Sequence, residues 1–135
     1  MEHFEEIEHT ADWAFRIRGR TLAELFLNAA RAVCWPRGAA PQFEPSVMRE
    51  VSVEGVDRET LLVNWLNELL YLQETKGEAY NRFEITEISE TSLRARVEGR
   101  TREASDANPI KAVTFHDLRI TEEKDGFEVT VVVDV

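Results

Sequence analysis

The sequence predicts an α+β fold, a single domain in which a mostly antiparallel β-sheet packs with two amphipathic helices. Two segments repeat apolar residues every three or four positions, which is typical of helices with a buried face. Six shorter segments alternate apolar and polar residues or are rich in β-branched residues, which favours strands. The order is strand, helix, strand, helix and then four strands, and no linker interrupts residues 1–135. This order indicates one domain built from a sheet and helices.

The first strand and the first helix have clear boundaries. Residues 12–18 alternate apolar and polar side chains, as a half-buried strand does, and Gly19 ends the pattern. Thr21 and Glu24 form a capping box, in which the Thr21 hydroxyl accepts from the Glu24 amide while the Glu24 side chain reaches back. Pro36 ends the helix. The apolar stripe of this helix comprises Leu22, Leu25, Phe26, Ala29, Ala30, Val33 and Cys34.

A loop, a strand and a second helix follow. Residues 37–45 contain one glycine and two prolines and are predicted to be a loop, and residues 50–55 alternate weakly, as a strand. Asp57 can cap the second helix, and Gly77 is a plausible end. The apolar residues of this helix spread beyond one face, so we expect it to be buried on more than one side. They are Leu61, Leu62, Val63, Trp65, Leu66, Leu69, Leu70, Tyr71 and Leu72.

The rest of the chain is predicted to be β-structure. Turn-forming residues separate the apolar segments, at 89–92, 99–109 and 124–126. The Asp125–Gly126 step is typical of a tight hairpin between the last two strands. The four strands are expected to cover residues 80–88, 93–97, 111–120 and 127–133.

The charge balance limits the classes of partner. The chain has 26 acidic and 16 basic residues, for a formal net charge of −10. Because phosphate binding draws mainly on Lys and Arg, we expect no strong binding of RNA or DNA by this chain alone. The balance suits a protein that holds cations or docks on a basic partner surface. Acidity that simply keeps a small protein soluble is the other interpretation.

The single cysteine and the start of the chain bear on location. Cys34 has no second cysteine to pair with, which fits a reducing compartment. At an apolar helix position it is expected to be a buried structural thiol rather than a nucleophile. The first residues lack the basic and apolar regions of a signal peptide, and no apolar run approaches the roughly 20 residues that span a membrane. We therefore expect a cytoplasmic protein that does not bind membranes.

Three familiar site types are absent from the sequence. It has no Gly-rich phosphate-binding loop, which makes a nucleotide-hydrolysing domain of the common kind unexpected. It has no Cys-x-x-Cys pair and no His-Glu-x-x-His run, so a zinc site with soft ligands is not expected. It has no Gly-x-Ser-x-Gly elbow. These absences count against an enzyme in its own right.

Acidic residues stand at the start of the first predicted strand and at the end of the last. By alternation, Asp134 faces away from Val131 and Val133, and Asp12 faces away from Trp13. If the two strand ends lie side by side, their carboxylates converge, and the α-carboxylate of Val135 could supply a third acidic group. Close carboxylates repel unless a proton or a cation intervenes, and Ca²⁺ or Mg²⁺ fits oxygen ligands best. The ordinary alternative is a turn or capping aspartate and a solvated terminus.

Three further polar residues have two interpretations each. On a strand, His116 would share a face with Ala112 and Thr114, which favours a core histidine with one hydrogen bond over a ligand or catalytic role. Lys111 opens the same strand and could be a solvated surface lysine or the cation that meets a phosphate or carboxylate. His9, in the N-terminal segment, has the same ambiguity as His116.

Together these segments resemble the archease family. The likeness covers nearly the whole chain, in order and at compatible spacing. A single block would be weak, whereas the set is specific. The matching blocks are His9-Thr10-Ala11-Asp12, residues 19–26, residues 61–71, residues 97–100, Lys111-Ala112-Val113-Thr114-Phe115-His116 and Val133-Asp134-Val135.

The resemblance implies a function that the residues alone do not. Archeases are similar in being non-catalytic partners of the RtcB-type RNA ligase, which joins a 3′-phosphate or 2′,3′-cyclic phosphate end to a 5′-hydroxyl in tRNA splicing. They promote GTP-dependent guanylylation of the ligase and its multiple turnover. Family members bind a divalent cation, seen as calcium, and the matching positions here are Asp12 and Asp134. Mg²⁺ or Mn²⁺ are alternatives, and Lys111 matches the lysine implicated in activation. A role as a general chaperone or modulator of RNA-modifying enzymes is the alternative.

One segment departs from the family pattern. Archeases usually carry an acidic residue and an Arg-His pair in the turn before the lysine strand. Here residues 101–109 contain no histidine. We therefore assign the role of that histidine to no residue of this chain, including Asp106.

Overall fold

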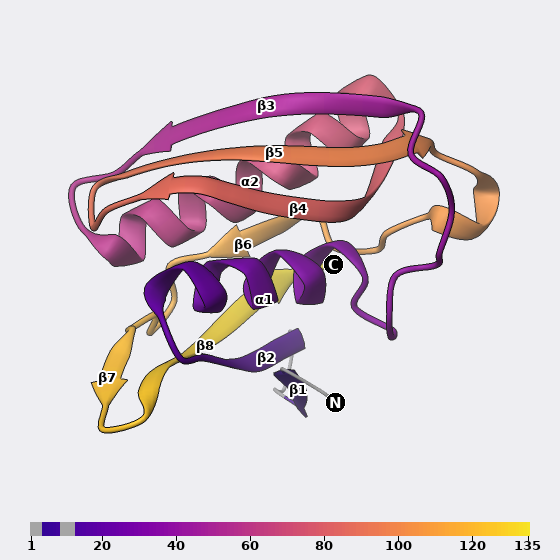
Figure 1. Cartoon of the computed structure of the whole chain (residues 1–135). Coiled ribbons are helices and arrows are strands. Elements are labelled where there is room, and N and C mark those ends of the chain that lie inside the picture. The colour runs from indigo at the N-terminus through magenta and orange to yellow at the C-terminus, as the bar shows by residue number, and fades with distance from the viewer. Residues whose placement is uncertain (1–3, 9–12) are drawn as a thin grey trace.

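Two antiparallel β-sheets enclose the two helices of the chain (Figure 1). The structure is a computed structural model that describes residues 4–8 and 13–135. Over these residues the elements are β1 (Phe4–Glu8), β2 (Trp13–Gly19), α1 (Leu22–Cys34), β3 (Val47–Glu54), α2 (Arg58–Lys76), β4 (Glu78–Ile88), β5 (Ser92–Thr101), a short 3₁₀ turn (Ala104–Asp106), β6 (Ala112–Thr114), β7 (Thr121–Glu123) and β8 (Gly126–Asp134).

The chain order of the strands differs from their spatial order. The first sheet, sheet A, runs β1-β2-β8-β6, and β7 also pairs with β8. The second, sheet B, runs β3-β5-β4. α1 contacts β2 and β8 of sheet A and β4 of sheet B, while α2 contacts β6 of sheet A and all three strands of sheet B. The helices therefore form the middle layer, and their apolar side chains supply the core between the sheets.

The first helix begins almost as the sequence predicts. The Thr21 hydroxyl accepts from the Glu24 N–H at 3.1 Å, but the Glu24 carboxylate reaches back to the N–H of Arg20, at 3.0 Å, rather than to that of Thr21. Cys34 in the last turn is 3% exposed, and burial raises the pKa of its thiol. The prediction of a buried structural thiol is confirmed, because a protonated, enclosed sulfur is a poor nucleophile.

The second helix confirms both of its predicted ends. The Asp57 carboxylate accepts from the Thr60 N–H at 2.8 Å, and Gly77 adopts the left-handed conformation, with φ of 64°, that ends many helices. Burial on several sides is also confirmed, since the helix lies between two sheets. The Trp65 indole N–H donates to the Phe26 carbonyl at 3.0 Å and joins the two helices. Within the described residues, no helix has both the length and the apolar content to cross a membrane.

The structure differs from the predicted strands in three details. Residues 111–120 do not form one strand: β6 covers three residues, and a turn separates it from β7. Asp117 has a left-handed φ of 50°, and the Leu118 N–H donates to the Phe115 carbonyl at 3.1 Å, so the extended backbone is broken there. β1 has no counterpart in the prediction, because three glutamates in five residues hide its alternation. The strands also divide between two sheets instead of one.

Sheet B is longer than its sequence pattern indicates. β3 begins at Val47 rather than at residue 50, and β5 runs on to Thr101 through the glycine that we expect to begin a turn. Gly99 is needed there because strand β4 passes very close. A Cβ at Gly99 would lie 1.9 Å from the Ala79 carbonyl oxygen and 2.7 Å from the Tyr80 Cα.

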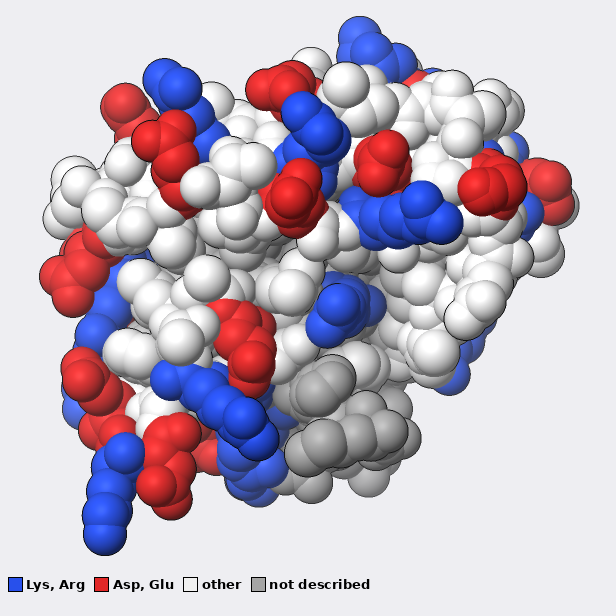
Figure 2. Space-filling model, viewed as in Figure 1, with Lys and Arg blue, Asp and Glu red and all other residues white. Residues whose placement is uncertain are grey.

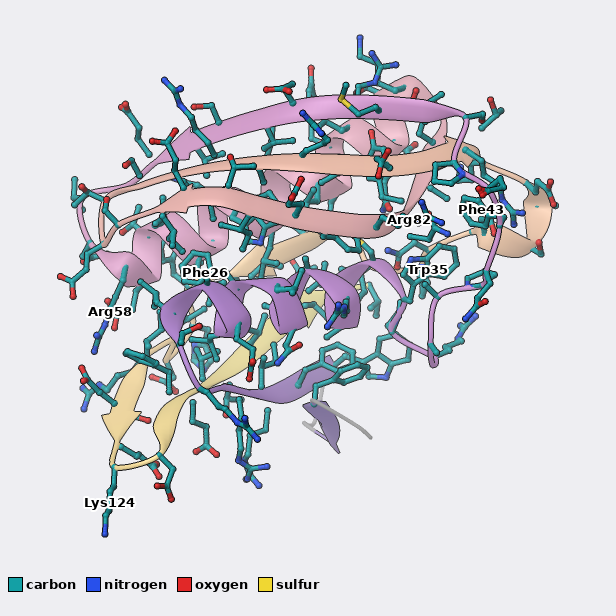
Figure 3. The ribbon with its side chains drawn as sticks, viewed as in Figure 1. Phe26, Trp35, Phe43, Arg58, Arg82 and Lys124 are labelled. Atoms are coloured by element: carbon teal, nitrogen blue, oxygen red, sulfur yellow. The ribbon has the colours of Figure 1, made fainter. Side chains whose placement is uncertain are left out.

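The last hairpin is tight, as the sequence predicts. Glu123 of β7 pairs with Gly126 of β8, so Lys124 and Asp125 alone form the turn. Figure 3 shows Lys124 projecting from the tip of this hairpin. A Cβ at Gly126 would lie 2.4 Å from the Gly19 carbonyl oxygen, so the hairpin base rests directly on the end of β2.

A buried charge network joins the two edge strands of sheet B. Glu78, which is 5% exposed, accepts two bonds from the Arg49 guanidinium, at 2.6 and 3.0 Å, and one from the Tyr80 hydroxyl at 2.7 Å. The bonds from Arg49 lower the pKa of the Glu78 carboxyl, against the opposing effect of burial. Burial and the bond to Glu78 raise the pKa of the Tyr80 hydroxyl. The carboxylate is therefore held charged inside the protein.

Candidate functional site

The candidate site lies at the end of sheet A where β8 finishes and β6 begins. Asp134 pairs with Ala112 across these strands, and the Lys111 N–H donates to the Asp134 carbonyl at 2.8 Å. Asp134, Val135 and Lys111 are all exposed, and the Val135 residue retains 53% of its accessible surface. The structure thus brings three of the four predicted site residues to one edge, although they come from separate segments of the chain.

The first predicted strand reaches the same end of the sheet. Trp13 pairs with Val133, and the register continues to Gly19 opposite Phe127. The predicted side-by-side arrangement of these two strands is therefore confirmed for residues 13–19. Asp12 and His9 lie outside the described residues, so the convergence of two carboxylates stays a prediction. Among residues 4–8 and 13–135, no three His, Cys, Asp or Glu side chains gather closely enough to hold a metal.

The last buried residues of β8 define where the exposed edge begins. Val131 and Val133 are fully buried, whereas Asp134 is exposed. Val132, on the same side of the strand as Asp134, is also buried, at 4% exposed, so both sides of β8 are covered as far as Val133. Asp134 lies immediately beyond the last buried position, where a carboxylate can meet solvent or a ligand.

The segment before Lys111 is held by a buried ion pair. Asp106 is 6% exposed and accepts from the Arg100 guanidinium at 2.9 and 3.1 Å and from the Glu103 N–H at 3.0 Å. Burial raises the pKa of the Asp106 carboxyl, but the bonds from Arg100 and Glu103 outweigh burial, and the net pKa is lowered. Arg100 also lies over the Phe43 ring, 4.1 Å from its centroid. Asp106 is committed to this network, which makes it a structural residue.

Two further contacts guide the chain into β6. The Asn108 side chain donates to the Val33 carbonyl at 2.9 Å and accepts from the Ile110 N–H at 3.0 Å. A pocket of about 240 Å³ lies between this segment and the end of α1. Its lining includes Cys34, which is protonated, and Asp106, which is bonded to Arg100. Lys111, Asp134 and Val135 are not among the residues that line it, so the pocket is separate from the exposed residues at the end of β8.

His116 lies outside the core. It lies in the turn after β6 with a side chain that is 71% exposed, and its Nε2 is 3.3 Å from an Asp117 carboxylate oxygen. The interpretation as a core histidine is wrong, because the strand on which it depended ends at Thr114. β6 separates His116 from Lys111, which lies before the strand. Exposure leaves both interpretations of Lys111 open, a solvated lysine or a cation for a phosphate or carboxylate.

Sequence reasoning missed one polar residue next to the site. The Asn67 side chain of α2 accepts from the Val113 N–H at 2.8 Å and donates to the Val113 carbonyl at 3.1 Å. A polar residue on a helix usually faces solvent, so the sequence pattern does not mark Asn67 as part of a site. The available signal was the pair Asn64 and Asn67 inside residues 61–72, a largely apolar stretch in which Glu68 is the one charged residue.

Solved structures share this architecture of helices enclosed by antiparallel sheets. The solution structure of Methanobacterium thermoautotrophicum protein 1598 superposes with a TM-score of 0.76, at 30% identity over 100% of both chains. The crystal structure of a Thermotoga maritima protein described as "an archease, possible chaperone" gives a TM-score of 0.67, at 27% identity over 97% of this chain and 96% of that one. The fold is therefore that of a small α+β domain already seen in archeases.

The chain belongs to the Archease protein family (MTH1598/TM1083), whose model matches residues 4–135. It is 36% identical to the protein archease of Sulfurisphaera tokodaii, over 100% of both chains. It is 37% identical to that of Methanosarcina acetivorans, over 98% of this chain and 95% of that one. The family resemblance identified from the sequence is confirmed.

Proposed function

We propose that this chain activates an RtcB-type RNA ligase in tRNA splicing by promoting guanylylation of the ligase, and that it does so in the cytoplasm without catalysing a reaction itself. The observation that supports this most directly is the edge of sheet A, where Asp134 and Lys111 are adjacent and exposed. These are two of the residues that match the functional positions of archeases. Their adjacency depends on strand pairing, which the sequence pattern alone does not give.

A divalent cation fits the donor groups at this edge. The carboxylates of Asp12 and Asp134 and the α-carboxylate of Val135 are hard oxygen donors, the ligands preferred by Ca²⁺, Mg²⁺ and Mn²⁺. Exposure of the last two residues leaves such a cation accessible to a partner. A bound cation would supply charge neutralisation and orientation for phosphate groups at the ligase active site. Lys111 would pair with a phosphate oxygen or with one of these carboxylates.

The charge distribution supports a protein partner rather than direct RNA binding. On the face shown in Figure 2, Lys and Arg side chains are interspersed with Asp and Glu, and they form no continuous basic surface there. Sheet B contributes ion pairs such as Arg94 with Glu87, at 3.5 Å, and Arg96 with Glu50, at 3.8 Å. With a net charge of −10, the chain is suited to docking on the basic surface that a ligase presents to RNA and GTP.

Replacing Asp134 with asparagine is expected to reduce stimulation of ligase guanylylation by about 10- to 100-fold, because the neutral amide is a poor ligand for a hard cation. The measurement is GMP loading of a purified RtcB-type ligase with increasing amounts of this protein. Asp125→Asn is the matched control, because Asp125 is also an exposed acid and lies in the turn before the opposite end of β8. Asp134→Asn and Asp12→Ala variants that stimulate loading as well as the wild type would refute the proposal.

A general chaperone is the second candidate, since the Thermotoga structure is described as a possible chaperone. A chaperone that holds unfolded clients needs a contiguous apolar surface. The large apolar residues that are exposed among the described residues come from five separate segments, namely Met48, Val56, Tyr71, Phe115 and Val135. Five exposed side chains are few for a surface of that kind, which favours the activator. The chaperone alternative predicts suppression of aggregation of unrelated proteins, unaffected by Asp134→Asn.

A further inference from the structure

The strand that follows Lys111 is short and has one outward-facing main-chain pair. In an antiparallel edge strand, alternate residues direct both their N–H and their C=O away from the neighbouring strand. β6 has three residues, and the central one, Val113, directs both groups away from β8. The Asn67 side chain binds both of them, at 2.8 and 3.1 Å. A single side-chain amide thus takes the place of a neighbouring strand.

The same helix holds the chain a second time beyond the turn. The Glu59 carboxylate accepts from the Ile120 N–H at 3.1 Å, and the Arg58 guanidinium donates to the Ile120 carbonyl at 3.2 Å. Figure 3 shows Arg58 at the end of α2 near β7. α2 therefore runs antiparallel beside residues 113–120 and closes this edge of sheet A at both ends. Of the two attachments, that of Asn67 is the nearer to Lys111 in the sequence.

We infer that Asn67 is a positioning residue for the candidate site, because it fixes the strand that aligns Lys111 with Asp134. Three residues paired with β8 on one side only make a weak strand, since short isolated strand pairs are marginally stable in water. The Lys111 N–H bond to the Asp134 carbonyl lies directly before this strand. Without the Asn67 amide, two main-chain groups at the edge lose their partner and the strand end is free to separate from β8. The inference rests on the proposed function only for the link to cation binding.

The first test measures amide hydrogen exchange in the full chain. In Asn67→Ala, the Val113 and Lys111 amides are expected to exchange about tenfold faster or more, as loss of a hydrogen bond requires. Asn64→Ala is the matched control, since Asn64 also donates from α2 to a main-chain carbonyl, that of Glu54, at 2.7 Å, but away from β6. Asn64→Ala should leave the exchange rates of the Val113 and Lys111 amides unchanged. Unaltered exchange at Lys111 in Asn67→Ala would overturn the inference.

Asn67→Asp tests the contact itself. If Asn67→Ala does not fold, Asn67→Asp is compared with the wild type alone, through exchange of the Lys111 amide. At neutral pH its carboxylate still accepts from the Val113 N–H but cannot donate to the carbonyl. The Val113 amide should therefore be better protected in Asn67→Asp than in Asn67→Ala. Equal exchange in the two variants, or wild-type exchange of the Lys111 amide in Asn67→Asp, would contradict the inference.

The second test measures Ca²⁺ affinity by calorimetry at a temperature where all variants are folded. Residues that orient metal ligands typically affect affinity by 10- to 100-fold, and a loss of this size is expected for Asn67→Ala but not for Asn64→Ala. Wild-type affinity in Asn67→Ala, together with faster Lys111 exchange, would overturn the positioning role. If the wild-type protein itself binds no divalent cation, the proposed function fails, whereas the exchange experiment still decides whether Asn67 aligns Lys111 with Asp134.

Discussion

Replacing Gly99 with alanine is expected to lower the free energy of unfolding by about 3 kcal/mol. The added Cβ would lie 1.9 Å from the Ala79 carbonyl oxygen and 2.7 Å from the Tyr80 Cα. Both contacts are with backbone atoms, which cannot rotate aside as a flexible side chain can. Strands β4 and β5 would have to separate where their register shifts between Tyr80 and Arg82.

Urea denaturation followed by circular dichroism measures this loss. Thr101→Ala on the same strand is the control, because Thr101 is exposed and its substitution should change stability by less than about 0.5 kcal/mol. A Gly99→Ala variant as stable as this control would mean that the two strands do not approach so closely.

Replacing Glu78 with alanine is expected to cost about 3 kcal/mol at neutral pH. The substitution removes two charge-assisted bonds from Arg49 and leaves the buried Tyr80 hydroxyl without its acceptor at 2.7 Å. Glu84→Ala is the control, since Glu84 is exposed on the same strand. The measurement is the midpoint of urea denaturation. A midpoint for Glu78→Ala equal to that for Glu84→Ala would contradict the expectation.

The same carboxylate gives stability a defined pH dependence. Its pKa in the folded protein is lowered, chiefly by the bonds from Arg49, relative to the ordinary value of 4.5. Between the folded pKa and 4.5 the unfolded chain binds more protons than the folded one, so stability falls with falling pH. The contribution is complete above about pH 4.5 and is lost as pH falls through the folded pKa. Denaturation midpoints between pH 3 and 7 should decline less steeply in Glu78→Ala than in the wild type.

The parts of the fold that the sequence predicts well are those with local causes. Asp57 and Gly77 define the ends of α2 through contacts within one helical turn, so their residue types are sufficient. β1, whose three glutamates hide its alternation, is defined by its pairing with β2, and the break after β6 also has a non-local cause. The break depends on the left-handed backbone at Asp117 and on how α2 holds Ile120. No periodic pattern encodes such contacts.

In the candidate site, too, the sequence predicts the features with local causes and not those that depend on strand pairing. Alternation correctly predicts the buried side of the strands of Trp13 and Asp134, but Ala14 and Val132 on the opposite side are buried as well, and the pattern does not say which strands pair. The register that brings Lys111 beside Asp134 arises from the pairing of β6 with β8. Asn67 was not predictable as part of the site, because its importance comes from the main-chain groups of Val113 and not from its own neighbours in the sequence.

Enclosure of the single thiol has a practical use. Cys34 sits at the end of α1 between the two sheets, and the sequence contains no other sulfhydryl that would compete with it. Because Cys34 is 3% exposed and lines the pocket at the end of α1, alkylating reagents are expected to reach its sulfur mainly when the end of this helix opens locally and the thiol ionises. The rate of alkylation of Cys34, followed by mass spectrometry, therefore measures how often the structure opens at the end of α1. No engineered label is needed.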